Sequence, residues 1–304
     1  MTAIVLVIVA ALVGLALGGE LLVRGTVGIA HRLRISPMIT GLVLVGAATS
    51  MPEMVASVDA ALLGSPGIAW GNIVGSNLAN TLLILGTVAL VAPITLTGLG
   101  RRDAVVALVA TIVLAAMAYS GFAGRMTGVL LLVALTIYLI WRATHPRSDV
   151  EEDMKVPGMA VAVLVFLAGL AVLLGSGHFL VENAITLAQM VGLSETVIGL
   201  TVVAIGTSLP ELAASLAAAR RGEPGLAIGN VVGSNIFNIL LIGGVTMTIA
   251  PAPLPADLAG GQMILLLASA LVLWLALWRL SAIGRVLGAV LLAVFLANIA
   301  WQLA

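Results

Sequence analysis

Two carboxylates, Glu53 and Glu211, lie inside apolar stretches long enough to cross a bilayer, and each directly follows a proline. A charged side chain at the centre of a membrane-spanning helix costs roughly 2.5 to 3.5 kcal/mol on insertion scales, so each carboxylate needs a partner or a polar cavity. No basic residue of the surrounding segments lies at a comparable depth. A mobile cation can supply the missing positive charge, and the pattern therefore predicts a cation site.

Further oxygen-bearing side chains recur at helical spacing around each carboxylate. Thr49 and Ser50 precede Glu53 at i, i+4 and i, i+3 spacing, which places their oxygens on one helix face. Pro52 clashes with the carbonyl four residues back and so frees it as a further oxygen ligand. A serine and an asparagine at i, i+4 spacing follow in the next segment. The candidate ligands are Thr49, Ser50, Glu53, Ser76, Asn80, Thr207, Ser208, Glu211, Ser234 and Asn238.

These residue types predict an all-oxygen cage that carries two formal negative charges. Hard cations such as Ca²⁺ and Na⁺ prefer such ligands, whereas Mg²⁺ gives up its hydration shell reluctantly. The chain contains no cysteine and the two motif segments contain no histidine, which argues against softer transition metals. No resident cofactor is expected, because the predicted cations are cargo.

An internal repeat supplies the same ligand set twice. Residues 41–86 align without a gap on residues 199–244, an offset of 199 − 41 = 158, and more than half of the aligned positions are identical. Shared apolar composition does not produce such identity. The duplication therefore indicates two related halves that each contribute one carboxylate.

The composition predicts an all-α membrane protein, because 62% of the residues are hydrophobic and only 9% are charged. About 20 apolar residues make one span, and ten such stretches can be counted. Residues 1–141 form a first five-helix repeat, residues 142–157 a cytoplasmic linker loop, and residues 158–304 a second five-helix repeat. Because five is odd, the second repeat is expected to be inverted relative to the first. The ten expected spans lie near 3–29, 38–62, 68–92, 103–121, 125–141, 158–187, 196–220, 225–250, 260–279 and 282–303.

Basic residues fall almost entirely on one side of this ten-helix topology, which by the positive-inside rule is the cytoplasmic side. Only Arg125 falls on the opposite side, and Arg24 lies within the first helix. Both termini are then expected outside, in a multi-pass protein of the cytoplasmic membrane. The cytoplasmic basic residues are Arg32, Arg34, Arg101, Arg102, Arg142, Arg147, Lys155, Arg220, Arg221, Arg279 and Arg285.

The paired "GTSLPE" and "GNVVGSN" segments resemble the repeats of the cation/calcium antiporter superfamily, in particular its sodium/calcium exchanger branch. The resemblance implies that Glu53 and Glu211 are the central Ca²⁺ ligands, helped by Thr49 and Thr207. It also implies a first and a sixth helix that slide across the rest. The resemblance further implies flanking Na⁺ sites made by Ser50, Ser76, Asn80, Ser208, Ser234 and Asn238.

Two positions depart from the usual pattern of this family. Ala48 stands where a glycine usually precedes the threonine, and Asn238 stands where some archaeal and potassium-dependent members carry aspartate. Coupling to K⁺ is therefore disfavoured, and the stoichiometry is open. The expected partners are Ca²⁺, Na⁺ and the lipid bilayer, with neither nucleic acid nor an obligate protein partner.

Three alternatives to sodium/calcium exchange were weighed. A proton-coupled Ca²⁺ antiporter is the main alternative, because protons need only the two carboxylates. A cation channel also uses carboxylates, but channels are usually built from several subunits around a pore axis. An enzyme is not expected, because the chain lacks a nucleophile with its base, a reactive aspartate pair and an HExxH zinc motif.

Other polar residues inside the apolar stretches receive structural interpretations. Glu20 and Arg24 are spaced i, i+4 on the first helix and are expected to neutralise each other. His178 and Glu182 occupy the aligned positions on the sixth, where a packing role is expected and a gating or proton-sensing role is the alternative. The remaining asparagines are expected to tie neighbouring helices together. They are Asn72, Asn77, Asn230 and Asn235.

Overall fold

The computed structural model describes residues 2–96, 98–122, 124–145, 157–190, 204–255 and 258–303. These residues form α-helices, three short π-helical segments and one pair of two-residue strands. In chain order the elements are α1 (Thr2–Leu33), α2 (Pro37–Thr40), η1 (Gly41–Val45), α3 (Gly46–Thr49), α4 (Met51–Leu62), α5 (Pro66–Leu78), η2 (Ala79–Ile84), α6 (Leu85–Val91), β1 (Ile94–Thr95), α7 (Arg101–Ser120), α8 (Arg125–Thr144), α9 (Met159–Met190), α11 (Ala204–Thr207), α12 (Leu209–Arg220), α13 (Pro224–Phe237), η4 (Asn238–Ile242), α14 (Gly243–Ile249), α15 (Gly261–Arg279), β2 (Ala282–Ile283) and α16 (Arg285–Leu303).

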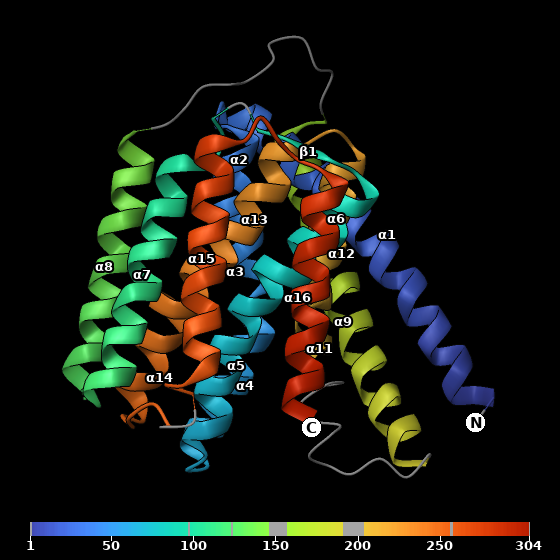
Figure 1. Cartoon of the computed structure of the whole chain (residues 1–304). Coiled ribbons are helices and arrows are strands. Elements are labelled where there is room, and N and C mark those ends of the chain that lie inside the picture. The colour runs from blue at the N-terminus through green and yellow to red at the C-terminus, as the bar shows by residue number, and fades with distance from the viewer. Residues whose placement is uncertain are drawn as a thin grey trace.

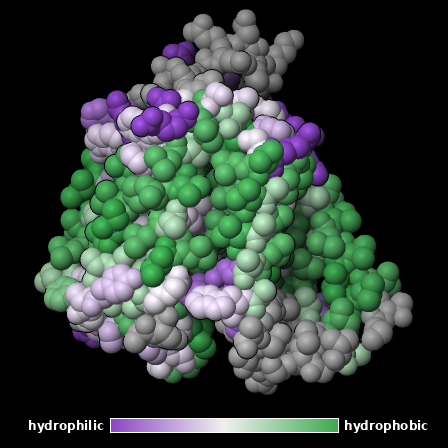
Figure 2. Space-filling view, viewed as in Figure 1, coloured by the Kyte–Doolittle hydropathy of each residue, from purple (hydrophilic) through white to green (hydrophobic). Residues whose placement is uncertain are grey.

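The helices are long and apolar enough to span a membrane, as the composition predicts. Within the described ranges, eight helices pass this test, and the bent pair formed by 37–49 and 51–62 brings the number to nine. The expected seventh span, 196–220, lies partly outside the described residues, and its described part forms α11 and α12. Figure 2 shows a broad apolar band on the visible face, with hydrophilic residues gathered toward its two ends.

The two longest helices, α1 and α9, pack against each other along one side of the molecule (Figure 1). Glycines bring their backbones together. A Cβ added at Gly25 would lie 2.3 Å from the backbone nitrogen of Phe166, and one at Gly169 would lie 2.3 Å from that of Leu22. Because real Cβ atoms do not approach so closely, only glycine permits this contact.

The remaining helices surround α5 and α13, which form the centre of the protein. Nearly every residue of α13 is buried, including its polar ones. Here too glycines allow close backbone contact, because a Cβ at Gly229 would lie 2.3 Å from the carbonyl oxygen of Met38. This main core contains Trp70, Leu114, Val232 and Leu277, whereas the residues of α1 and α9 belong to a second, smaller core.

Two helix boundaries differ from the sequence prediction. Ala282 and Ile283, expected at the start of the last span, instead pair with Thr95 and Ile94 as antiparallel strands, and α16 begins at Arg285. The helix α8 continues to Thr144, past the predicted linker boundary at residue 142. The rest of that linker, residues 146–156, lies outside the described residues.

Arg142 was expected to face the cytoplasm from the linker, but it is buried. Its Nε lies 2.9 Å from Oδ1 of Asp103, and the Tyr138 hydroxyl donates a hydrogen bond to the same oxygen at 2.8 Å. Burying a single charge is far more costly than burying a paired one. The acid on α7 therefore explains why this arginine can lie inside the helix bundle.

Candidate cation site

Each candidate carboxylate lies directly after a break in its helix. Ser50 separates α3 from α4 with φ −81° and ψ 5°, and the two parts of this span are bent by 42°. Ser208 separates α11 from α12 with φ −89° and ψ 4°. In both cases proline occupies the first turn of the new helix, where its missing N–H costs nothing. Glu53 and Glu211 follow in that turn, near the positive end of the helix dipole.

The two carboxylates come from different halves of the chain but meet in one buried region. Both side chains are 2% exposed, and they are close enough for their negative charges to repel each other. Ser50 Oγ lies 3.5 Å from Oε1 of Glu211, a contact between residues 161 positions apart. Thr49 also lies against Glu211, and Ser208 lies against Glu53. The first half therefore contributes hydroxyls to the carboxylate of the second half, and the reverse also holds.

Asparagines support both carboxylates in the same way. The Asn72 side-chain amide donates hydrogen bonds to the backbone carbonyl of Glu53 at 3.0 Å and to Ser57 Oγ at 2.9 Å. Asn230 does the same for Glu211 at 3.2 Å and for Ser215 Oγ at 2.8 Å. These bonds fix α5 to α4 and α13 to α12, which agrees with the helix-tying interpretation of both asparagines.

The other candidate ligands lie on α5, α13 and the π-helical segments that follow them. Ser76, Asn80, Ser234 and Asn238 are all at most 3% exposed. Asn80 lies in η2, which packs against α12, whereas Asn238 begins η4, which packs against α4 and α5. Single π-helical turns often occur at functional sites. Each half therefore packs its asparagine-bearing π-helical segment against the helix that carries the other half's carboxylate. Thr207 ends α11 beside this region and is half-buried.

Several buried polar atoms of this region have no hydrogen-bond partner among the described residues. They include one carboxylate oxygen of each acid and polar atoms of four further candidate ligands. Because buried polar groups in proteins are normally hydrogen-bonded, such a concentration needs an explanation. The atoms are Glu53 Oε2, Glu211 Oε2, Asn80 Oδ1 and Nδ2, Ser208 Oγ, Ser234 Oγ and Asn238 Oδ1.

A cation would satisfy the oxygens among these atoms, but acidic groups alone do not make a complete site. No group of three or more His, Asp or Glu residues in the described ranges could hold a metal ion. Hydroxyl and amide oxygens would have to complete the coordination, which suits Ca²⁺ and Na⁺. The region therefore combines two carboxylates with neutral oxygens, the ligand types that hard cations prefer.

Two of the asparagines contact the other half directly: Thr49 Oγ1 donates to Asn230 Oδ1 at 3.5 Å, and the partner of Asn235 was not singled out from the sequence. Asn235 donates a hydrogen bond to Thr81 Oγ1 at 2.9 Å, whereas Asn77 donates to the carbonyl of Ile73 in its own helix. The prediction that Asn77 ties neighbouring helices together is therefore wrong for its side-chain amide. Thr81 directly follows the candidate ligand Asn80, and this position is the feature of the sequence that could have pointed to it.

Known proteins resemble this chain over nearly its whole length. It is 39% identical to a protein of Alkalimonas amylolytica named putative antiporter CaxA, over 94% of this chain and 95% of that one. It is 30% identical to the sodium/calcium exchanger MaX1 of Methanosarcina acetivorans, over 79% and 81% of the two chains. A structure of the sodium-calcium exchanger NCX_Mj, soaked with Na⁺ and Sr²⁺, superposes with a TM-score of 0.87 at 33% identity and covers 98% of this chain and 97% of that one.

The family model described as sodium/calcium exchanger protein matches residues 3–144 and 161–304. The two matched ranges contain every candidate ligand, and both reach well beyond the repeated motifs. The chain belongs to the sodium/calcium exchanger protein family.

Proposed function

We propose that the protein exchanges Ca²⁺ for Na⁺ across the cytoplasmic membrane by alternating access. The observation that supports this most directly is the pair of buried carboxylates, each with an oxygen that has no hydrogen-bond partner among the described residues. Two carboxylates match the charge of one Ca²⁺, and the surrounding hydroxyls and amides supply neutral oxygen ligands. Cations that bind here neutralise the site, which would otherwise hold two charges in a low-dielectric region.

The proposed ligands are the ten residues singled out from the sequence. Glu53 and Glu211 would bind Ca²⁺ at the centre, with Thr49 and Thr207 beside them. The serines and asparagines would complete flanking Na⁺ sites. We further propose two inverted five-helix halves, 1–141 and 158–304, which place both termini outside and the 142–157 linker in the cytoplasm. Inverted repeats with interrupted helices are a recurring design of secondary transporters.

Transport in proteoliposomes tests the coupling ion. Vesicles loaded with Na⁺ are diluted into Na⁺-free medium, and ⁴⁵Ca²⁺ entry is followed. We expect uptake that requires internal Na⁺ and saturates with Ca²⁺. Uptake driven by a pH gradient and indifferent to Na⁺ would instead identify a proton-coupled antiporter. Flux that needs neither counter-ion and does not saturate would identify a channel.

A further inference from the structure

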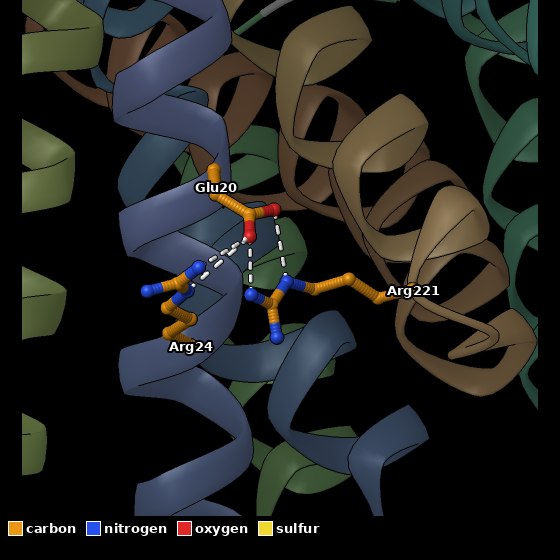
Figure 3. Close-up of polar contacts among 3 residues, drawn as sticks. All are labelled: Glu20, Arg24 and Arg221. Carbon is orange, nitrogen blue, oxygen red and sulfur yellow. Dashed lines mark hydrogen bonds and ion pairs between the residues drawn. The ribbon is translucent and has the colours of Figure 1, made fainter.

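Glu20 on α1 forms an ion pair with an arginine from a distant part of the chain (Figure 3). Arg221, the residue after α12, donates through Nε to Oε2 of Glu20 at 2.8 Å and through Nη2 to Oε1. Arg24, one turn further along α1, also reaches Oε1, at 3.1 Å. The sequence predicts the Glu20–Arg24 pair, but not the participation of Arg221. One carboxylate is thus shared by two guanidinium groups, and the Arg221 contact is bidentate, the stronger geometry for such pairs.

This ion pair links two parts of the molecule that otherwise share an apolar core. The helices α1 and α9 form their own core, which extends onto α12 through Ala214 and Ala218. A Cβ at Gly19 would lie 2.8 Å from the carbonyl oxygen of Ala213, so α1 lies directly on the backbone of α12. Glycine and alanine have little side chain to interlock where α1 lies on α12, so this contact offers little resistance to a sliding motion of α1 along α12. The Glu20–Arg221 pair is therefore a polar contact at the edge of a largely apolar interface.

The aligned positions in the other half carry no matching contact. The 158-residue offset relates Glu20 to His178, Arg24 to Glu182 and Leu63 to Arg221. His178 and Glu182 lie 4.0 Å apart on α9 itself, with side chains 75% and 63% exposed. Leu63 is an apolar residue, 82% exposed. The repeat thus provides an ion pair between helices in one half, and the described residues show no counterpart in the other.

We propose that the Glu20–Arg221 ion pair is a one-sided lock that holds α1 and α9 against the end of α12 and favours the arrangement in this structure over its alternate. If the two halves exchange roles during transport, the alternate arrangement places His178 and Glu182 opposite Leu63, and no equivalent ion pair forms. The protein then has an intrinsic conformational bias that does not depend on bound cations. This inference rests on alternating access, but not on which ion is coupled.

The electrostatics around Arg221 agree with such a lock. Hydrogen bonding to Glu20 raises the pKa of Arg221, and the charges of Glu20 and Glu223 add to this effect. Both partners are only partly exposed, at 33% for Arg221 and 37% for Glu20. Exposed ion pairs contribute little, but bidentate geometry and partial burial strengthen this one. Its loss should therefore shift a two-state equilibrium by about two- to tenfold.

The chain contains no cysteine, so two spin labels can be placed without background. Leu33 at the end of α1 and Arg102 at the start of α7 are both exposed, and each is replaced by cysteine and spin-labelled. The distance between the two labels reports the position of α1 relative to the main core. The measurement is made on the full chain in nanodiscs, without Na⁺ or Ca²⁺. One distance population corresponds to the arrangement in this structure and a second to its alternate. We expect Glu20→Gln and Arg221→Gln each to raise the ratio of the second population to the first by about two- to tenfold. Combined, they should shift the ratio no further than either alone, because they break the same contact.

Matched controls separate this contact from a general charge effect. Arg220→Gln removes the neighbouring positive charge, and Glu182→Gln removes an acid from α9; both should leave the distances unchanged. A short bis-methanethiosulfonate crosslinker, which forms a disulfide with each of Glu20→Cys and Arg221→Cys and releases methanesulfinate, should abolish transport until a reductant cleaves it. Unchanged distances in Glu20→Gln and Arg221→Gln, equal shifts in the controls, or full transport by the crosslinked protein would each overturn the proposal. A wrong coupling ion would leave the distance results unaffected.

Discussion

Asn230 donates its side-chain amide to the backbone carbonyl of Glu211 at 3.2 Å, and thereby holds the first turn of α12 against α13. Asn72 makes the same contact with Glu53 in the other half. The carboxylates themselves are left to interact with hydroxyls and with one another. Each acid is therefore positioned through its backbone, while its side-chain oxygens stay available for a ligand.

The two carboxylates should be indispensable for transport. Glu53→Gln and Glu211→Gln keep the side-chain shape but remove the charge that a divalent cation needs, so we expect each to lower Ca²⁺ uptake at least 100-fold, about 2.7 kcal/mol. Size-exclusion profiles should stay normal, because an amide is less costly to bury than a charge. Asp59→Asn, an exposed acid on the same helix α4, is the control and should transport normally. Retained transport in either glutamine variant would refute the proposed site.

The supporting asparagines should affect both stability and cation affinity. Asn230→Ala removes two buried hydrogen bonds and leaves Ser215 Oγ without its donor, which should cost about 1 to 3 kcal/mol of unfolding free energy. The thermal shift produced by Ca²⁺ should also shrink, because the first turn of α12 is no longer fixed. Asn183→Ala removes an exposed bond within α9 and serves as the comparison. Equal melting temperatures for the two variants in detergent would contradict this role.

The buried pair of Arg142 and Asp103 should be strongly coupled. Arg142→Gln leaves a buried acid with its strongest partner removed, and we expect a loss of about 3 to 5 kcal/mol in unfolding free energy. Adding Asp103→Asn should restore part of that loss, because the uncompensated charge disappears. Arg102→Gln, at an exposed position next to Asp103, should change little. Additive losses in the double variant, measured by thermal melts, would show that the two residues act independently.

Close packing of α1 and α9 should depend on particular glycines. Gly25→Ala places a methyl group 2.3 Å from the backbone of Phe166, so the helices must separate. Gly175→Ala on α9 meets no atom within 4 Å and is the matched control. Alanine favours a helix over glycine by about 1 kcal/mol, so the control should be neutral or slightly stabilised while Gly25→Ala loses stability and transport. Identical behaviour of the two variants would mean that the close contact does not matter.

Part of this architecture could be predicted from the sequence because the internal repeat contains the same motifs twice. The breaks at Ser50 and Ser208, the carboxylates that follow them and the asparagine ties at Asn72 and Asn230 all recur at the 158-residue offset. Most of the expected spans also match described helices to within a few residues. The ten-helix count stays a prediction, because part of one span is not described.

The features that escaped prediction occur once and depend on tertiary packing. Arg142 stands next to a polar stretch, which suggests a loop, and only its approach to Asp103 on a neighbouring helix explains its burial. Arg221 resembles any other residue of the positive-inside pattern until α1 brings Glu20 beside it. The strand pair between Ile94 and Ile283 joins two connecting segments that are far apart in the chain. No spacing rule along one segment reveals such contacts.

The length of α1 makes the protein sensitive to the membrane around it. Its 32 residues span about 48 Å at about 1.5 Å per residue, well beyond a hydrocarbon thickness of about 30 Å. A tilted crossing would accommodate this length, and in Figure 1 α1 is inclined relative to helices such as α7 and α8, with much of its side-chain surface exposed. Acyl-chain length should then set its tilt. The rate of the proposed exchange should then depend on bilayer thickness, because thinner bilayers tilt α1 further and change its position on α12.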